Sequence, residues 1–293
     1  MSAQVPRSYL YVPGDAGRRL ALANRRGADA IIADLEDGVA PTQKAIAREQ
    51  VAAWLAPPAA PAEVERWVRL NVDAQGIDDL EQVFGAGLQG VCIPKVADPE
   101  DVRRVARVLA RLEHASHWSG PVVCIMPLIE SALGLLSAVE IARAPRVFCL
   151  QLGEVDLAAD LGLEPTTDEF ELLNARSTVV TASRAARLTP PVGAVHIELQ
   201  DLAGLEQSTW RLRRLGFRSR AAIHPSQLPI IHKVFSPTRE ELDDARRLVA
   251  KYEDAQKSGI GVLLDEKGRM VDEAVVLRSR AMLALARAEE GPG

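Results

Sequence analysis

The chain has 293 residues and a formal net charge of -5, with 40 acidic and 35 basic side chains. This length suits either two average domains or one α/β barrel. The acidic balance argues against a nucleic-acid partner. The N-terminus lacks an apolar signal region, and no apolar stretch approaches the roughly 20 residues of a membrane helix. We therefore expect a cytoplasmic protein without a membrane partner.

Short apolar runs alternate with stretches of helical period along the chain. The runs are continuous and rich in β-branched residues, as expected of strands that are covered on both faces. Eight strand–helix alternations predict a TIM (β/α)8 barrel, with an open doubly wound sheet as the alternative. No early GxGxxG motif follows a strand to support that alternative. The runs are Tyr9–Val12, Ala30–Leu35, Trp67–Asn71, Gly90–Pro94, Val122–Ile129, Val147–Leu152, Val192–Ile197 and Ala221–Ile223.

Polar residues mark where two long helices begin. Asp98, followed by proline and glutamate, is a good N-terminal cap. Thr238 and Glu241 fit a capping box in front of another helix. The proline-rich stretch 57–61 predicts a surface loop.

The character of the sequence changes after residue 256. A glycine-rich apolar stretch leads to a turn at 265–268, and residues 270–290 predict a final helix. We therefore expect a barrel domain over 1–256 and a C-terminal helical extension over 257–293. This extension either folds back or covers the active site of a neighbouring subunit.

The three cysteines give no sign of a metal site or a disulfide framework. Cys92, Cys124 and Cys149 each lie in an apolar run, without metal-ligand spacing. We interpret them as buried residues in strands of a protein from a reducing compartment.

Charged residues follow the apolar runs on six of the eight predicted strands. Barrel enzymes carry their chemistry at the C-terminal ends of the strands, so these groups meet on one face although they are far apart in sequence. They are Asp34, Glu36, Asp37, Arg69, Lys95, Glu130, Glu154, Asp156 and His224.

Glu130 and Asp156 follow neighbouring predicted strands and form the first candidate site. Two carboxylates without nearby cysteine or histidine give a hard, oxygen-only site that suits Mg²⁺. Glu154 is a rival ligand beside Asp156. The alternative is that Glu130 and Asp156 merely cap the helices that follow them.

Arg69 lies inside a strand sequence, where a guanidinium is costly unless it faces the barrel mouth or pairs with a carboxylate. Its planar fork fits a substrate carboxylate in two parallel hydrogen bonds. Asp34, Glu36 and Asp37 would orient waters around a metal, or form a purely structural network with Arg69 and Lys95. A buried pair of Arg69 with Asp34 or Asp37 is the simpler alternative. His224 is better suited to bracing a loop than to acting as a base.

Seven motifs occur in an order that resembles the citrate lyase β-subunit-like family. They are RSYLYVPGD, GADAIIADLEDGVAP, VRLN, IPK, PLIESALGLLSAVEIA, LGEVDLAADLG and LGFRSRAAIHPSQLPIIHKVFSPT. The family belongs to the malyl-CoA and citramalyl-CoA lyase group of the HpcH/HpaI aldolase superfamily. The resemblance runs from about residue 7 to residue 238, with a weaker match in the tail. The segment AVHIELQDLAGL departs from the family pattern, and Asp201 keeps one expected position there.

The resemblance implies roles for particular residues. Glu130 and Asp156 match the metal ligands, and Arg69 matches the arginine that grips the carboxylate or keto acid. Glu36 and Asp37 match acids around the metal waters. The tail motif GRMVDEAVV places Asp272 where related enzymes carry a catalytic aspartate that reaches the adjacent subunit. Residues matching the substrate channel are Tyr11, Pro13 and Gly14, with Arg18 or Arg19 facing CoA phosphates.

The function that the resemblance implies is a magnesium-dependent carbon–carbon lyase acting on a β-hydroxyacyl-CoA thioester. It would work by retro-Claisen cleavage or the reverse condensation, in a homotrimer or larger homo-oligomer. One alternative is a citrate lyase β subunit that cleaves a citryl thioester on a partner acyl-carrier protein. Another is a pyruvate-type metal aldolase, which usually needs a histidine base that the early strand ends lack. A non-catalytic barrel that serves as a binding or scaffold protein is the alternative from a different class.

Overall fold

A computed structural model of the protein describes residues 5–56, 64–259, 261–265 and 268–290. The chain divides into a barrel unit, Val5–Phe235, and a C-terminal unit that begins at Ser236. Among the described residues, no helix is both long and apolar enough to cross a membrane. The loop expected at 57–61 and residues 266–267 of the expected turn lie outside the described residues.

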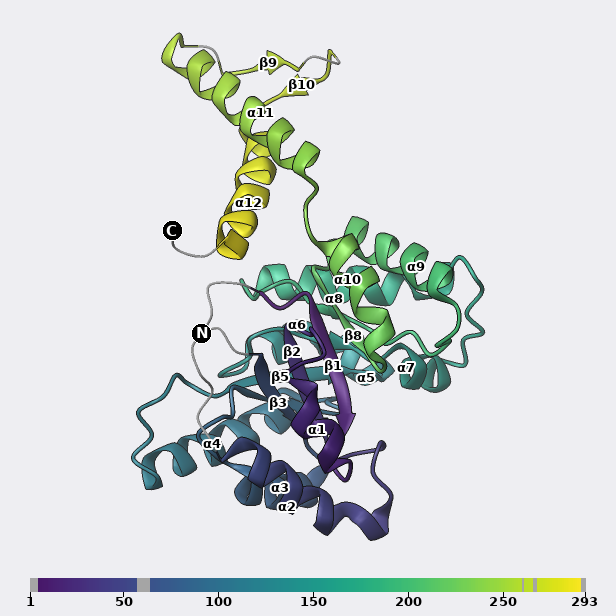
Figure 1. The fold of residues 1–293 in the computed structure, drawn as a ribbon. Helices are drawn as coiled ribbons and strands as arrows, with labels where there is room; N and C mark the ends of the chain where they lie inside the picture. The colour runs from purple at the N-terminus through teal and green to yellow at the C-terminus, as the bar shows by residue number, and fades with distance from the viewer. Residues whose placement is uncertain (1–4, 57–63, 260, 266–267, 291–293) are drawn as a thin grey trace. The chain divides into compact units, whose positions relative to one another are not determined.

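The barrel unit is the closed eight-stranded parallel barrel that the sequence predicts, and the open sheet is excluded (Figure 1). The strands follow one another in chain order, and the first pairs with the last to close the barrel. Strands six and seven are shorter than their apolar runs. Val147 makes only an isolated bridge, and Thr189 Oγ1 donates a hydrogen bond to the Phe148 carbonyl at 2.7 Å. The strands are β1 (Ser8–Pro13), β2 (Ala30–Asp34), β3 (Glu65–Arg69), β4 (Gly90–Ile93), β5 (Cys124–Ile129), β6 (Gln151–Leu152), β7 (Val192–Gly193) and β8 (Ser219–Ala222).

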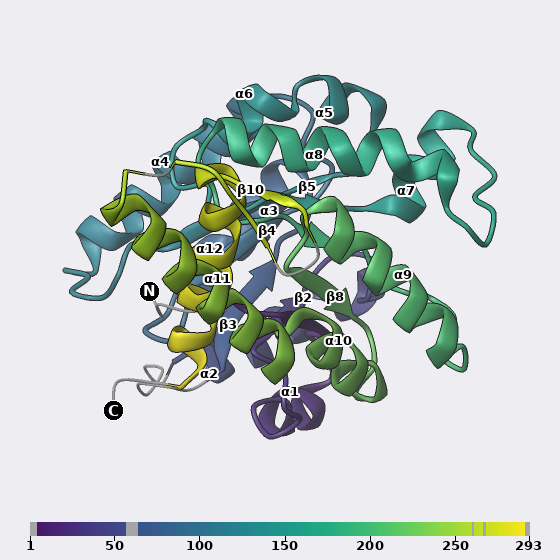
Figure 2. The same ribbon diagram turned by 90° about the horizontal axis from the view of Figure 1, so that it is seen from above.

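Helices surround the strands of the barrel unit (Figure 2). The cap expected at Asp98 is confirmed, since its side chain accepts a hydrogen bond from the backbone N–H of Glu100 at 2.7 Å. The helices are α1 (Gly17–Ala23), α2 (Lys44–Leu55), α3 (Asp73–Val83), α4 (Pro99–Ala115), α5 (Ala132–Leu136), α6 (Ala138–Ala142), α7 (Glu154–Leu161), α8 (Leu173–Ala185), α9 (Leu202–Leu215) and α10 (Leu228–Phe235), with 3-10 turns η1 (Pro41–Gln43), η2 (Phe170–Leu172) and η3 (Pro225–Gln227).

Large side chains fill the interior of the barrel. Trp67 is 1% exposed and packs edge-on against Tyr9, with ring centroids 5.9 Å apart. A Cβ added at Gly90 would lie 2.3 Å from the Trp67 ring, so the indole depends on a glycine in the neighbouring strand. Cys92, Cys124 and Cys149 are buried free thiols, as predicted. The interior is therefore a packed core, which leaves the strand ends to carry polar groups.

The C-terminal unit is a helical hairpin with a small antiparallel sheet. Its elements are α11 (Arg239–Lys257), β9 (Leu263–Leu264), β10 (Met270–Val271) and α12 (Glu273–Glu290). Tyr252, Val271 and Val276 form its buried apolar cluster. The capping box expected at Thr238 and Glu241 is confirmed at the start of α11. The final helix expected over 270–290 begins only at Glu273, because Met270 and Val271 pair with β9 as a strand. Strands of two residues are too short to show an alternating pattern in the sequence.

The division of the chain differs from the expected boundary at residue 256. Helix α11 was expected to belong to the barrel domain, but the C-terminal unit begins before it, at Ser236. The reason is packing, because Tyr252 of α11 is buried against Val271 and Val276.

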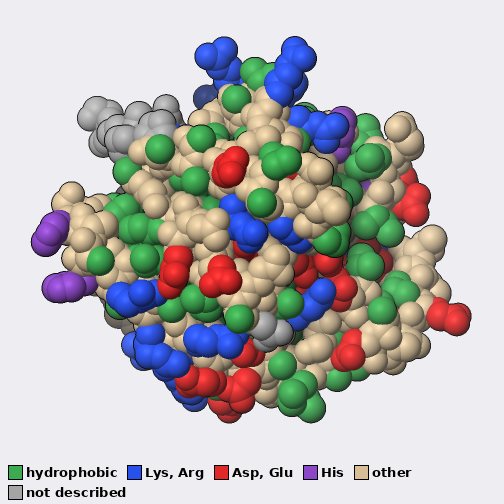
Figure 3. All heavy atoms as spheres, turned by 90° about the horizontal axis from the view of Figure 1, so that it is seen from below, with side chains coloured by type: hydrophobic (Ala, Val, Ile, Leu, Met, Phe, Trp, Pro, Cys, Tyr) green, Lys and Arg blue, Asp and Glu red, His purple; other side chains and the backbone are tan. Residues whose placement is uncertain are grey.

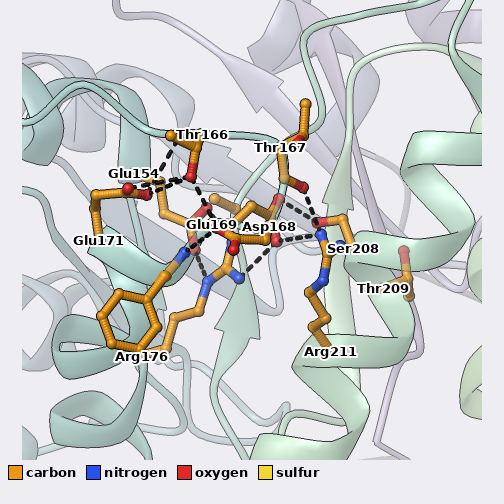
Figure 4. A network of polar contacts seen from close by, with 12 residues as sticks. Glu154, Thr166, Thr167, Asp168, Glu169, Glu171, Arg176, Ser208, Thr209 and Arg211 are labelled. Atoms are coloured by element: carbon orange, nitrogen blue, oxygen red, sulfur yellow. Dashed lines mark hydrogen bonds and ion pairs between the residues drawn. The ribbon is translucent and has the colours of Figure 1, made fainter.

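A buried arginine joins the helices on one side of the barrel unit (Figure 4). Arg176 of α8 grips Glu154 of α7 with two nitrogens at 2.6 and 2.7 Å. Its third nitrogen donates to Glu169 at 2.7 Å, and Glu169 also accepts from Ser208 of α9 at 2.7 Å. The Arg176 side chain is 1% exposed, so these ion pairs are screened little by water.

We expect Arg176→Met to lower the free energy of unfolding of the barrel unit by about 3–5 kcal/mol, because it leaves two carboxylates without their buried partner. Urea unfolding followed by tryptophan fluorescence measures this, since Trp54, Trp67, Trp118 and Trp210 all lie in the barrel unit. The control is Arg107→Met, which removes an ion pair from an arginine that is 65% exposed and should cost less than about 1 kcal/mol. Equal effects in the two variants would contradict the assigned role of Arg176.

Candidate active site

A cavity of about 340 Å³ opens at the C-terminal ends of the barrel strands. On the face toward which the β1 arrow points in Figure 1, acidic and basic side chains lie interspersed (Figure 3). The cavity brings together residues from distant parts of the chain, as the barrel topology predicts. Its polar lining includes Tyr11, Arg19, Asp34, Arg69, Glu130, Gln151, Glu154 and Asp156, and its apolar lining includes Leu128, Val155, Ala194, Val195 and Ile223.

The guanidinium of Arg69 is held by Asp34 along one edge and by the Tyr11 ring against one face. Asp34 accepts from Nε at 2.7 Å and from Nη2 at 2.6 Å, and Nη1 lies 2.7 Å from a Glu36 oxygen. The guanidinium carbon lies 5.1 Å from the centre of the Tyr11 ring, and the Tyr11 hydroxyl donates to Gln151 at 3.0 Å. A guanidinium has five N–H donors, of which Asp34 takes two and Glu36 forms an ion pair beside Nη1, so at least two on the terminal nitrogens are left for a ligand.

The loop after β2 supplies the negative charge that balances Arg69. Asp34 is 4% exposed and accepts hydrogen bonds from the backbone N–H groups of Glu36 and Gly38 at 2.9 and 3.0 Å. Lys95 Nζ lies 3.0 Å from Glu36 and 3.6 Å from Asp37. The hydrogen bond to Glu36 raises the pKa of Lys95. The network with Arg69 and Lys95 that we considered from the sequence is therefore present, including the Arg69–Asp34 pair.

Glu130 is a buried carboxylate at the end of β5. It is 5% exposed, and its Oε1 accepts from the backbone N–H of Lys95 at 2.5 Å. Burial, followed by the charges of Asp156 and Glu36, raises the pKa of Glu130 to about 7. Glu130 does not cap the next helix, because Ser131 does so through a hydrogen bond from Gly134.

Close packing fixes the other side of the Glu130 carboxylate. A Cβ added at Gly153 would lie 2.5 Å from its Oε2 and 2.7 Å from its Cβ. The turn between β6 and α7 therefore reaches Glu130 only because residue 153 has no side chain.

Asp156 lies in the first turn of α7 and lines the same cavity. The N-cap of α7 is Gly153, which makes no side-chain capping bond, so the capping alternative for Asp156 is not what the structure shows. Glu154, the rival ligand, is engaged by Arg176 in two hydrogen bonds. Among the described carboxylates that line the cavity, Glu130 and Asp156 are the two without an ion pair to an arginine or lysine side chain.

The donor set fits a magnesium ion. In the part of the chain that the structure describes, no three histidine, cysteine, aspartate or glutamate side chains cluster closely enough to hold a metal by themselves. Magnesium keeps several waters and often takes one or two protein carboxylates, so a pair such as Glu130 and Asp156 is sufficient. Burial and the charge of Asp156 raise the pKa of Glu130 to about 7, and a bound cation would favour the ionised form of this carboxylate.

The remaining predicted residues fall in three places. Pro13 lines the cavity, and Gly14 lies just behind it, where its N–H donates to the Asp34 carbonyl at 2.8 Å. Arg18 does not line the cavity, whereas Arg19 does, because successive residues of a helix point about 100° apart. Asp272 lies in the C-terminal unit and caps α12 by accepting from Val275 N–H at 3.1 Å.

Two further polar residues cap helices, and one cavity residue was not predicted from the sequence. His224 caps η3 through Ser226, which agrees with the bracing role. Asp201 caps α9 by accepting from Gly204 at 2.8 Å. Gln151 was missed, although a glutamine inside the apolar run of β6 is a signal that could have found it.

Comparisons with known proteins identify the family of this chain. The family described as HpcH/HpaI aldolase/citrate lyase matches residues 7–225. The citrate lyase subunit beta of Escherichia coli (strain K12) is 35% identical over 97% of this chain and 93% of its own length. A (3S)-malyl-CoA thioesterase of Cereibacter sphaeroides (strain ATCC 17025 / ATH 2.4.3) is 35% identical over 96% of this chain and 95% of its own.

Two solved structures share the fold over most of this chain. CitE from Mycobacterium tuberculosis, in complex with magnesium, acetoacetate and coenzyme A, aligns with a TM-score of 0.80 and 31% identity over 98% of this chain and 100% of its own. The citrate lyase beta subunit from the same organism, complexed with oxaloacetate and magnesium, aligns with a TM-score of 0.67 and 30% identity over 81% of this chain and 100% of its own. With the family match over residues 7–225, the resemblance seen in the sequence motifs is confirmed. This chain belongs to the HpcH/HpaI aldolase/citrate lyase family.

Proposed function

We propose that this protein is a magnesium-dependent carbon–carbon lyase that cleaves a β-hydroxyacyl-CoA thioester, or forms it by the reverse condensation. The observation that carries the proposal is the meeting of Glu130, Asp156 and Arg69 on one cavity at the barrel mouth. Relatives named citrate lyase subunit beta and a structural relative holding magnesium and coenzyme A support it.

The residues of the cavity divide the work. Glu130 and Asp156 would hold Mg²⁺, which when bound polarises the hydroxyl or keto oxygen of the substrate. Arg69 would bind the substrate carboxylate through its two remaining N–H groups, with Tyr11 and Asp34 keeping its plane fixed. The apolar side of the cavity would exclude water from the acyl group.

Cleavage requires two proton movements. The substrate hydroxyl would pass its proton to a solvent water at the open barrel mouth and become the keto oxygen, while the carbon–carbon bond breaks and its electrons pass to the α-carbon of the thioester. A proton must then reach that carbon to release the acyl-CoA. We propose that Asp272 of a neighbouring subunit in a homotrimer or larger homo-oligomer delivers it, and removes it again in the condensation direction.

A panel of thioesters tests the function. Malyl-CoA, β-methylmalyl-CoA, citramalyl-CoA, hydroxymethylglutaryl-CoA and citryl-CoA would be offered with and without magnesium, and the keto acid and acyl-CoA would be quantified. We expect magnesium-dependent cleavage of one thioester, and its loss in Glu130→Gln but not in the surface variant Glu140→Gln. No turnover by folded, magnesium-binding protein would favour a carrier-protein substrate, tested with citryl-loaded acyl-carrier protein, or a scaffold role.

Thioester hydrolysis is the second candidate function, because relatives 35% identical to this chain are named (3S)-malyl-CoA thioesterase. The same panel separates the two reactions. A lyase releases a keto acid and an acyl-CoA, whereas a thioesterase releases the intact hydroxy acid and free CoA.

We expect Gly153→Ala to weaken magnesium binding about tenfold or more, because its Cβ would occupy the place of the Glu130 side chain. Isothermal titration of magnesium chloride measures the effect. The matched control is Gly261→Ala, where an added Cβ meets nothing within 4 Å. Unchanged magnesium affinity in the first variant would show that Glu130 is not a ligand or is not held by this contact.

Magnesium affinity should depend on pH. Because burial raises the pKa of Glu130 to about 7, the carboxyl is mostly protonated below that pH and must lose its proton to bind a metal. We expect the affinity to fall about tenfold per pH unit below pH 7 and to level off above about pH 8. Titrations between about pH 6 and pH 8.5 check this, and Glu130→Gln should lack the dependence. Equal affinity at both ends of that range in the wild type would contradict it.

Asp272→Asn should lower turnover by about 10²–10⁴-fold with little change in magnesium affinity. Asparagine caps helices as well as aspartate does, so the substitution keeps the hydrogen bond to the start of α12 and removes only the proton-transferring group. Steady-state rates with the best thioester, beside magnesium titrations, make the test. Wild-type turnover in this variant would rule Asp272 out as the proton donor.

A further inference from the structure

Lys44, the first residue of α2, directs its ammonium into the loop that follows β2. Its Nζ lies 2.6 Å from the Leu35 carbonyl, 2.6 Å from the Glu36 carbonyl and 2.7 Å from Asn71 Oδ1. An ammonium has three N–H donors, and each has an acceptor here. All three acceptors are neutral oxygens, so the lysine contributes a fixed positive charge as well as three charge-assisted hydrogen bonds.

The two carbonyls belong to the loop that holds Arg69. Asp34 receives the N–H groups of Glu36 and Gly38 on one side of this loop. Lys44 Nζ donates hydrogen bonds to the carbonyls of Leu35 and Glu36 on the other. The backbone around Glu36 is thus held through its donors and its acceptors, which sets the direction in which the Glu36 side chain leaves the loop.

Asn71 extends the connection to the next strand. It follows Arg69 by two positions, and its Nδ2 and backbone N–H donate to Asp79 at 2.6 and 2.9 Å. Asp79 is fully buried and also accepts from Arg48 at 3.1 Å. Lys44 therefore ties the loop after β2 to the segment after β3, the strand that ends at Arg69.

We propose that Lys44 is a positioning residue for recognition of the substrate carboxylate, a role that rests on the proposed function of the barrel mouth. Lys44 keeps the Glu36 carboxylate on one terminal nitrogen of Arg69, where the two lie 2.7 Å apart. In this arrangement two guanidinium N–H groups stay available for the substrate. Without Lys44 the loop relaxes, and Glu36 competes with the substrate for the same donors.

The direct contacts of the lysine are with the loops that hold the arginine and not with the proposed metal ligands. Its acceptors are in the loops after β2 and β3, whereas Glu130 follows β5 and Asp156 lies in α7. The proposal therefore predicts a weaker grip on carboxylates with nearly normal magnesium affinity. A general loss of stability would lower both.

The test uses calorimetric binding of oxaloacetate in the presence of saturating magnesium. Lys44→Met, Arg69→Gln and the double variant are compared with wild type, and unfolding midpoints are recorded for each. Lys44→Gln keeps amide N–H donors and provides a second variant should the methionine fold poorly. Lys233→Met is the control, because this lysine is 65% exposed and its Nζ pairs with Glu206 at 2.7 Å.

Lys44→Met should weaken oxaloacetate binding about tenfold, with Lys44→Gln in between and the affinity for magnesium alone within about twofold of wild type. In the Arg69→Gln background the same substitution should have no further effect, because the residues act as one unit. KM for the thioester should rise more than kcat falls.

Two results would overturn the proposal. The first is wild-type oxaloacetate binding in Lys44→Met, and the second is losses from the Lys44 and Arg69 substitutions that multiply in the double variant. Wild-type protein that neither binds oxaloacetate with magnesium nor cleaves a thioester would instead overturn the proposed function, and the role of Lys44 with it.

Discussion

The ion pair between Arg69 and Asp34 joins two neighbouring strands where they enter the barrel mouth. These residues are register partners of β3 and β2, so the bidentate contact at 2.7 and 2.6 Å follows from the strand pairing. Because both side chains are largely buried, removing either one would leave an unpaired buried charge and lower the free energy of unfolding. Glu36, Lys95 and Lys44 are arranged around it, and together they turn a structural ion pair into a guanidinium with an open edge.

The Glu130 and Asp156 side of the barrel mouth has an excess of negative charge. Burial, together with the nearby charge of Asp156, raises the pKa of Glu130 to about 7. Arg176 removes Glu154 from this competition by holding it in two hydrogen bonds. The mouth is thus divided into a side that favours a cation and a side that favours a carboxylate, which is the arrangement that a metal-dependent reaction on an acid needs.

Much of the fold and of the candidate site could be predicted from the sequence. The eight strands follow from continuous apolar runs, and Glu130 and Asp156 were found because barrel topology gathers strand ends. The sequence could not show whether Arg18 or Arg19 of α1 faces the cavity. In a short helix without a clear apolar stripe, the sequence does not indicate which face is turned toward the barrel. Lys44 was missed for another reason, because bonds to backbone carbonyls leave no pattern in side-chain chemistry.

A crystal structure of the protein with magnesium and oxaloacetate is the most direct test of the division of the mouth. We expect the ion on carboxylate oxygens of Glu130 and Asp156, and a carboxylate of oxaloacetate on the terminal nitrogens of Arg69. Magnesium bound by Glu154 or Glu36, or oxaloacetate bound away from Arg69, would contradict the account.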